Sequence, residues 1–192
     1  MIKNKKFYRK KYQALRMKLL KEEIYDLSDK IVSILKTIPV WEKNTYHLFI
    51  SSKQKNEVET KKILSYLYDL GKVVVTSKML PDKKLIHLRV NQSTRFIQND
   101  YNILEPDSSE EILSTNLDVI IIPLLCFDKN GNRVGSGGGY YDKFLSKTKN
   151  AVIKIGLSFF EPVDHIDGIT ELDIPLDICV TSEKVYDFRK TI

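Results

Sequence analysis

The run DVIIIP, residues 118 to 123, restricts the possible folds of this chain more than any other stretch. Val119 and the three isoleucines after it leave no polar position, whereas a strand with one solvated face alternates apolar and polar residues. Such a strand is typical of the centre of a parallel sheet that is covered on both faces. Pro123 closes the run because proline has no backbone N–H to donate. The run therefore predicts a central strand of an α/β sheet.

Two apolar stripes at helical spacing precede Pro39, which ends the second. They are Tyr8, Tyr12, Leu15 and Leu19, followed by Leu20, Ile24, Leu27, Ile31 and Leu35. Further strands are predicted at residues 45–51, 72–76, 85–90, 151–159 and 177–181, and further helices at residues 57–71 and from residue 140. Residues 95–111 are predicted to form an irregular segment without helix or strand. The alternation predicts an α/β fold: a single three-layer domain over residues 1–192, with a central mostly parallel sheet flanked by helices and the N-terminal helices packed on it.

The basic character of the chain is confined to its N-terminal region. The formal net charge is +6, and residues 1 to 22 contain nine Lys or Arg and one acid, 9 − 1 = +8, so the remainder carries 6 − 8 = −2. Nucleic-acid binders more often spread basic and aromatic residues over a binding face, so no nucleic-acid partner is expected. The chain has no apolar run of 18 or more residues and no secretory signal. We expect a soluble, cytoplasmic monomer with no membrane partner.

The cysteines and histidines do not form a recognisable site. Cys126 and Cys179 are far apart and lack CxxC spacing, which argues against a disulfide framework and a zinc site. His47, His87 and His165 are equally scattered and form no HExxH pattern. We interpret all five as ordinary residues, with the thiols reduced.

Half of the eight glycines of the chain lie within GSGGGYYD, residues 135 to 142. A loop that follows a buried strand and leads into a helix is a common place for phosphate binding. The loop matches neither GxxxxGK[ST] nor GxGxxG in register, so by itself it could equally be a flexible surface loop. Its neighbours favour a ligand site. Arg133 could bind phosphate, Tyr140 and Tyr141 could cover a flat ring, and Asp142 could bind a divalent cation.

Residues 118 to 145 resemble the signature of the 5-formyltetrahydrofolate cyclo-ligase family, also called methenyltetrahydrofolate synthetases. NEVETKKI, from residue 56, resembles the family's Glu-Val-Asp-Thr segment, and YNILEP, from residue 101, its Gly-Ile-x-Glu-Pro segment. KIGLSF and LDICVTSEK resemble its C-terminal pair of segments. The resemblance extends from about Lys10 to about Lys184.

This resemblance implies an ATP- and Mg²⁺-dependent enzyme that converts 5-formyltetrahydrofolate, including polyglutamated forms, into 5,10-methenyltetrahydrofolate with release of ADP and phosphate. Arg133, Tyr140 and Asp142 would be catalytic, and Asp142 and Asp177 would hold Mg²⁺. Ser52 and Glu57 would bind the folate together with the loop from Ser136 to Tyr140. The nucleotide would be bound by Lys11, Arg16, Arg133, Val134, Gly135, Ser136, Gly137, Gly138, Gly139, Tyr140 and Tyr141. Taken without the resemblance, Glu57 would be a helix-start residue and Asp177 a turn residue.

The chain departs from the family pattern at a few positions. Four residues before Arg16, where the family usually has Lys or Arg, stands Tyr12, and the adjacent Lys11 points about 100° away on a helix. Pro162 and Ser77 stand in place of a glutamine and a proline. Two other functions stay open from the sequence: ATP-dependent activation of another formamide or amide, and binding of RNA or an acidic surface through the basic N-terminus.

Overall fold

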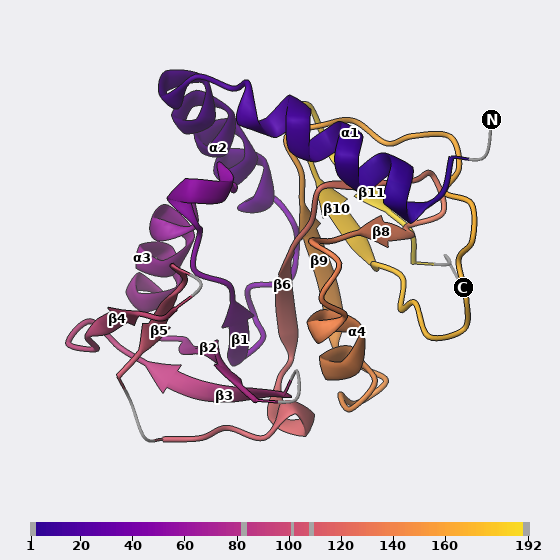
Figure 1. Ribbon diagram of the computed structural model, residues 1–192. Helices are drawn as coiled ribbons and strands as arrows, with labels where there is room; N and C mark the ends of the chain where they lie inside the picture. Colours follow the sequence, from indigo (N-terminus) through magenta and orange to yellow (C-terminus); the bar gives the residue numbers. More distant parts are fainter. Residues whose placement is uncertain (1–2, 82–83, 101, 108–109, 190–192) are drawn as a thin grey trace.

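The computed structural model describes residues 3–81, 84–100, 102–107 and 110–189. Its main sheet has seven strands, mostly parallel, and only the outermost strand at each edge pairs antiparallel with its neighbour (Figure 1). In spatial order the strands are β11 (Val185–Asp187), β10 (Ile178–Val180), β9 (Ile153–Leu157), β6 (Val119–Pro123), β1 (Thr45–Leu48), β2 (Val73–Leu80) and β3 (Lys84–Val90). The mostly parallel α/β sheet predicted from the sequence is confirmed.

Strand β6 occupies the middle of the sheet, as its composition predicts. Its side chains alternate between two cores: Val119 and Ile121 belong to one, and Ile120 and Ile122 to the other. All four are fully buried, so both faces of the sheet are covered. Apolar residues at every position are stable here because neither face of this strand meets water.

Helices α2 (Lys21–Leu35) and α3 (Lys61–Asp69) cover one face, and the short α4 (Tyr140–Leu145) packs on the other (Figure 1). Helix α2 begins where the carboxylate of Glu23 accepts a hydrogen bond from the backbone N–H of Leu20 at 2.7 Å. Leu20 itself is exposed, so the predicted stripe of this helix starts at Ile24. None of the helices in the described part of the chain has the length and apolar character needed to cross a membrane.

Helix α1 (Lys5–Met17) does not lie on the main sheet with α2. It packs on a separate two-stranded hairpin formed by β7 (Cys126–Phe127) and β8 (Arg133–Val134). The tight turn predicted at Asn130-Gly131 is confirmed, since Gly131 has φ of +82° between these strands. The buried face of α1 also differs from the predicted stripe, because Arg16 is buried and Leu15 is exposed.

Two predictions about regular structure were wrong. Residues 95–111, expected to be irregular, contain an antiparallel pair, β4 (Phe96–Gln98) with β5 (Leu104–Pro106), although residues 101 and 108–109 lie outside the described residues. The buried carboxylate of Glu105 ties this pair to β2 by accepting the N–H of Met79 at 2.7 Å. Strand β11 was not expected either. The short segments η1 (Lys53–Lys55) and η2 (Ser114–Asn116) complete the fold.

Candidate active site

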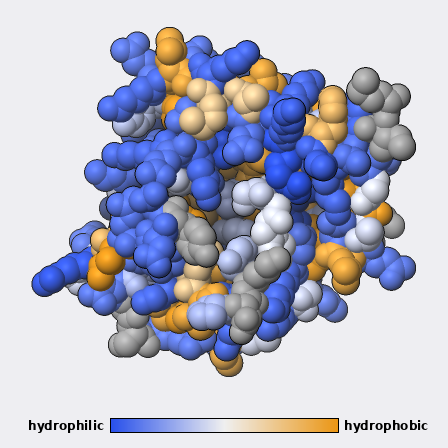
Figure 2. All heavy atoms as spheres, viewed as in Figure 1, coloured by the Kyte–Doolittle hydropathy of each residue, from blue (hydrophilic) through white to orange (hydrophobic). Residues whose placement is uncertain are grey.

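A pocket of about 610 Å³ opens between α1, the loop after β8 and the start of α4. We call it the glycine-loop pocket. Figure 2 shows a hollow near the middle of the corresponding face, bordered by pale residues of intermediate hydropathy in a mostly hydrophilic surface. Of the residues predicted to form the site, those lining the pocket are Arg16, Glu57, Arg133, Val134, Gly135, Ser136, Gly137, Gly138, Gly139, Tyr140, Tyr141 and Asp142.

The glycine loop is held against α1 through Arg9. The Nε of Arg9 donates to the carbonyl of Gly135 at 3.1 Å. Gly137 has φ of +97°, and a Cβ built there would lie 2.8 Å from the same Nε. A side chain at Gly137 would therefore be both strained and in the way. The loop has a specific conformation in contact with a cation, which disfavours the interpretation as a merely flexible surface loop.

Arg133 and Asp142 form an ion pair at the base of the pocket. Nη2 of Arg133 lies 2.6 Å from Oδ1 of Asp142, and the Arg133 side chain is only 6% exposed. A second guanidinium N–H donates to the carbonyl of Ile174. Burial lowers the pKa of Arg133, and the charge of Asp142 opposes that effect. The ion pair fixes the guanidinium of Arg133 in the wall of the pocket.

Glu57 lies outside the helix that was predicted to begin with it, because α3 starts only at Lys61. The turn η1 and the left-handed Asn56, at φ of +47°, bring the chain back on itself just before it. Oε2 of Glu57 accepts the backbone N–H of Ser52 at 2.9 Å. Ser52 is buried and orients this carboxylate from behind, and does not itself line the glycine-loop pocket.

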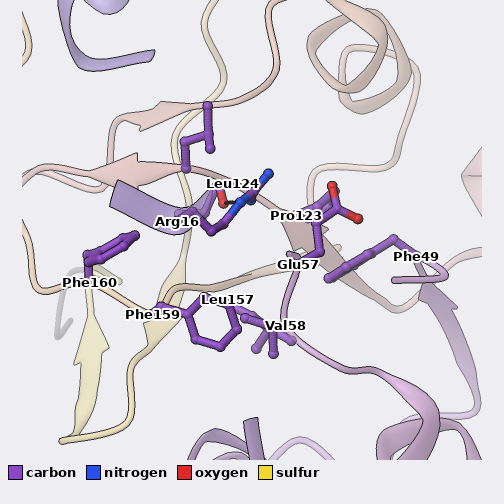
Figure 3. A pocket seen from close by; sticks show the side chains of 10 residues that line it. Arg16, Phe49, Glu57, Val58, Pro123, Leu124, Leu157, Phe159 and Phe160 are labelled. Atoms are coloured by element: carbon purple, nitrogen blue, oxygen red, sulfur yellow. Dashed lines mark hydrogen bonds between the residues drawn. The ribbon is translucent and has the colours of Figure 1, made fainter. Parts of the chain in front are cut away.

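A narrow recess of about 10 Å³ adjoins the pocket at Arg16 and Glu57, which line both spaces. Apolar and aromatic side chains form its walls, including Phe49, Phe159 and Phe160 (Figure 3). Nη1 of Arg16 donates to the carbonyl of Leu124 at 3.3 Å. Arg16, which the family resemblance assigns to the nucleotide, lines both spaces, and its guanidinium is close enough to Glu57 for the two charges to interact.

The two tyrosines have different environments. Tyr140 is half-buried at the start of α4, and its ring lies so close to Gly138 that a Cβ there would be 2.6 Å from it. Tyr141 packs between the pocket and the core, with its ring 6.1 Å from that of His47. Burial raises the pKa of Tyr141, as does the nearby charge of Glu57. Tyr141 therefore keeps its phenolic proton and can donate it in a hydrogen bond.

Besides Ser52, two predicted site residues, Asp177 and Lys11, do not line the pocket. Oδ2 of Asp177 accepts the backbone N–H of Lys154 at 2.7 Å and lies 2.8 Å from its Nζ. Lys11 lies over the ring of Tyr12, 5.5 Å from its centroid, and Tyr12 is buried against Phe160. Lys11 thus stays on the side of α1 that faces away, as helical geometry requires. Within the described ranges, no group of three or more His, Cys, Asp or Glu residues could hold a metal.

The sequence reasoning missed Lys5 and Arg9, which both line the glycine-loop pocket. Lys5 pairs with Asp173 at 2.6 Å, which joins the start of α1 to the far wall of the pocket. The available signal was spacing: Lys5, Arg9 and Arg16 follow one another at steps of four and seven, which place them on one helical face.

Comparison with known proteins shows the family of this chain. The model of the 5-formyltetrahydrofolate cyclo-ligase family matches residues 1–182. The 5-formyltetrahydrofolate cyclo-ligase of Haemophilus influenzae is 37% identical over 131 residues, covering 65% of this chain and 70% of that protein. The Escherichia coli K12 enzyme of the same name is 30% identical over 155 residues, covering 78% and 84%. The solution structure of Aquifex aeolicus 5,10-methenyltetrahydrofolate synthetase superimposes with a TM-score of 0.82 at 28% identity, covering 98% of this chain and 94% of that one. This chain belongs to the 5-formyltetrahydrofolate cyclo-ligase family.

Proposed function

We propose that the glycine-loop pocket is where this chain carries out the reaction of its family, the ATP-dependent conversion of 5-formyltetrahydrofolate to 5,10-methenyltetrahydrofolate. One observation carries the proposal. The pocket joins a cationic, glycine-lined end, with Arg9 and Arg133, to a carboxylate at the mouth of an aromatic recess, Glu57. The first end suits phosphates and the second suits the N–H groups of a flat heterocycle.

The chemistry explains why such a two-ended pocket is needed. A formamide carbon is a poor electrophile, and its oxygen is a poor leaving group. Transfer of the γ-phosphoryl to the formyl oxygen releases ADP and makes that oxygen part of a phosphate. The 10-nitrogen then attacks the carbon and loses its proton, and inorganic phosphate leaves with the former formyl oxygen. Positioning and charge neutralisation dominate such a reaction, so no nucleophilic side chain is required.

The nucleotide phosphates would be bound by Lys5, Arg9, Arg133 and the backbone of the loop from Gly135 to Gly139. Val134 has a fully buried side chain and could contribute only its backbone. The carbonyl of Gly135 already accepts from Arg9, which turns this guanidinium toward the loop. Two or three cations around bare backbone can neutralise the charge that develops during phosphoryl transfer.

The folate would lie with its pterin ring near Glu57 and its formyl group toward the loop. The ring of Tyr140 stands beside the loop and could cover a flat ligand. Ser52 acts through Glu57, whose orientation it fixes by donating its backbone N–H. Tyr141 could donate its phenolic proton to a phosphate or formyl oxygen, because burial keeps that proton in place.

Asp142 fits the role of a magnesium ligand. Both hydrogen bonds that reach its carboxylate, from Arg133 and from the N–H of Ile174, go to Oδ1. Oδ2 therefore accepts no hydrogen bond from the described residues, and the side chain is 36% exposed at the pocket. Bound Mg²⁺ would supply charge neutralisation for the phosphate oxygens. Asp177 fits less well, because it would have to give up Lys154.

The proposal is tested by incubating the purified chain with 5-formyltetrahydrofolate, ATP and Mg²⁺ and following the near-ultraviolet absorbance of the methenyl product. Glu57→Gln should raise the KM for the folate more than tenfold, since a carboxylate that accepts two N–H groups is lost. Glu59→Gln is the matched control, because Glu59 lies two residues away and outside both spaces. Absence of product across a range of pH and metal concentrations would exclude the proposed reaction.

Several properties stay predictions of the sequence. They are a single domain over residues 1–192, a monomer, a cytoplasmic location, polyglutamated substrates and the lack of a nucleic-acid partner. Assays of ATP hydrolysis with other formamides test the alternative that this scaffold acts on a different substrate. In that case another formamide would stimulate ATP hydrolysis, whereas 5-formyltetrahydrofolate would not. Salt-sensitive RNA binding that disappears on removal of residues 1–11 would favour the remaining alternative.

A further inference from the structure

A second pocket adjoins the glycine-loop pocket at Tyr140 and Lys143, which line both spaces. It holds about 150 Å³ between α4, strand β3 and residues 111–114 (Figure 1). We call it the lysine pocket, because its walls include Lys84, Lys143 and Lys147. The phosphoryl transfer described above makes no use of this space.

The lysine pocket is positively charged. Its walls carry three lysines and one acid, Glu111, 3 − 1 = +2. Lys84 and Lys147 are exposed, and neither forms an ion pair within the described part of the chain. The charge of Lys147 acts with burial to lower the pKa of His87 to about 4, so its ammonium group lies near that ring and His87 itself is neutral at pH 7. Two ammonium groups therefore remain available to an anionic ligand.

The floor of the lysine pocket is aromatic. The rings of His87 and Phe144 are both buried, with 4.0 Å between their centroids. Tyr140 lies one helical turn before Phe144, at the boundary with the glycine-loop pocket. Lys143 and Lys147 are likewise one turn apart, with Lys147 in the turn just after α4. A ligand that leaves the glycine-loop pocket here passes an aromatic ring first and ammonium groups next.

5-Formyltetrahydrofolate carries its groups in the matching order. An aminobenzoyl ring joins the pterin to a glutamate, and each further glutamate linked through the γ-carboxyl group adds one negative charge. We propose that the lysine pocket binds the carboxylates of this glutamate tail, and that Lys84 and Lys147 give the chain a preference for tails of more than one glutamate. The aminobenzoyl ring then lies against Tyr140. This inference rests on the proposed function and concerns a part of the substrate that does not react.

The kind of cation distinguishes this pocket from the phosphate end of the site. Around the glycine loop the cations include two arginines, Arg9 and Arg133, each held by hydrogen bonds to the protein. Such fixed guanidinium groups suit phosphate oxygens in one geometry. Lysine is a point charge on a flexible stem, so Lys84 and Lys147 can follow carboxylates whose positions change with tail length. Ion pairs between exposed groups are weak and are screened by salt, so the preference should be a few-fold and salt-dependent.

The experiment measures equilibrium binding of 5-formyltetrahydrofolate with one and with three glutamates, at about 20 mM and about 500 mM salt. The variant is Lys84→Gln with Lys147→Gln, which leaves Lys143 in place because that residue also lines the glycine-loop pocket. Lys30→Gln with Lys61→Gln is the matched control, since it removes the same charge from exposed positions on α2 and α3. Free tri-γ-glutamate is a third ligand. Thermal unfolding checks each variant, and the single substitutions replace the double variant if it does not fold.

The wild type should bind the triglutamate at least about fivefold more tightly than the monoglutamate at low salt, and less than about twofold at high salt. The Lys84 and Lys147 variant should reduce the low-salt preference below about twofold, with monoglutamate turnover within about threefold of wild type. The control variant should keep the preference.

Three results would overturn the inference: a wild-type preference below twofold, a preference that survives in the Lys84 and Lys147 variant, or an equal loss in the control variant. Free tri-γ-glutamate that binds as tightly as the triglutamate folate would also overturn it, because the pocket would then be a carboxylate site independent of the folate. If the wild type converts the monoglutamate in these cases, the proposed function survives; if it neither binds nor converts either folate, both proposals fail.

Discussion

Replacing Gly137 by alanine should damage the loop far more than the same change at Gly135, two residues earlier. At Gly137, φ is +97°, where a residue with a Cβ is strained by about 1–2 kcal/mol. The new Cβ would also lie 2.8 Å from Nε of Arg9, so that side chain must move and lose its bond to the carbonyl of Gly135, a further loss of about 0.5–1.5 kcal/mol. At Gly135 a Cβ would meet nothing within 4 Å, and φ is not positive.

The expected loss for Gly137→Ala is thus about 1.5–3.5 kcal/mol of unfolding free energy, which lowers Tm by about 3–14 °C in a chain of this size. Gly135→Ala should stay within about 0.5 kcal/mol of wild type. Thermal unfolding of both variants and titration with a non-hydrolysable ATP analogue provide the measurements, and the displaced Arg9 should cost Gly137→Ala about tenfold in affinity. Equal Tm values and equal affinities for the two variants would show that the loop adapts freely, and would refute the reasoning that glycine is required there.

Three further outcomes are expected. Asp142→Asn should lower Tm by a few degrees, because a buried cation loses its counter-charge, and turnover at saturating Mg²⁺ should fall at least about 100-fold; near-normal turnover would rule out the metal assignment. Burial lowers the pKa of His87 from 6.5 to about 4, and the charge of Lys147 acts in the same direction. The unfolded chain therefore binds this proton more readily than the folded chain. The contribution of His87 to the unfolding free energy is complete above pH 6.5 and is lost toward pH 4, by at most about 3 kcal/mol. His87→Phe should flatten this fall in denaturant unfolding, whereas a change at the exposed His165 should not. Burial raises the pKa of the Cys126 thiol to about 12, so iodoacetamide at neutral pH should label it only after unfolding; labelling of the native chain would contradict its burial.

The elements that sequence reasoning predicted well are those whose signal is local. The run DVIIIP allows only a doubly buried strand, and Asn130-Gly131 specifies a tight turn through its own backbone preferences. Strand β11 and the pair β4 and β5 were missed because they are only three residues long, too short to show a periodic pattern, although their pairing partners lie within ten residues in sequence. The contact that ties the β4–β5 pair to β2 is distant in sequence. Glu105, for example, is buried only because the N–H of Met79 is in position to meet it.

The site was predictable to the extent that its residues are consecutive. The stretch from Arg133 to Asp142 does line one pocket, and Glu57 faces it from another element. The buried face of α1 was less predictable. The apolar side chain of Leu15 is exposed, whereas the charged side chain of its neighbour Arg16 is buried. The carbonyl of Leu124 and the charge of Glu57 stabilise the buried guanidinium in part, and both are distant from Arg16 in sequence, so no local pattern reveals them.

The placement of α1 has a consequence for synthesis of the chain. Lys5 meets Asp173, Lys3 meets Asp167, and Arg9 meets Gly135, so the first helix reaches its partners only after most of the polypeptide exists. On a ribosome that adds about 5–20 residues per second, α1 must wait about 8–31 s for residue 173 to be added, with its apolar and basic faces unpartnered. A nascent chain halted before residue 173 would carry the glycine loop, but Lys5 would lack the partner that holds it at the pocket. Nucleotide retention by stalled nascent chains should therefore switch on late and abruptly, when the C-terminal third has emerged.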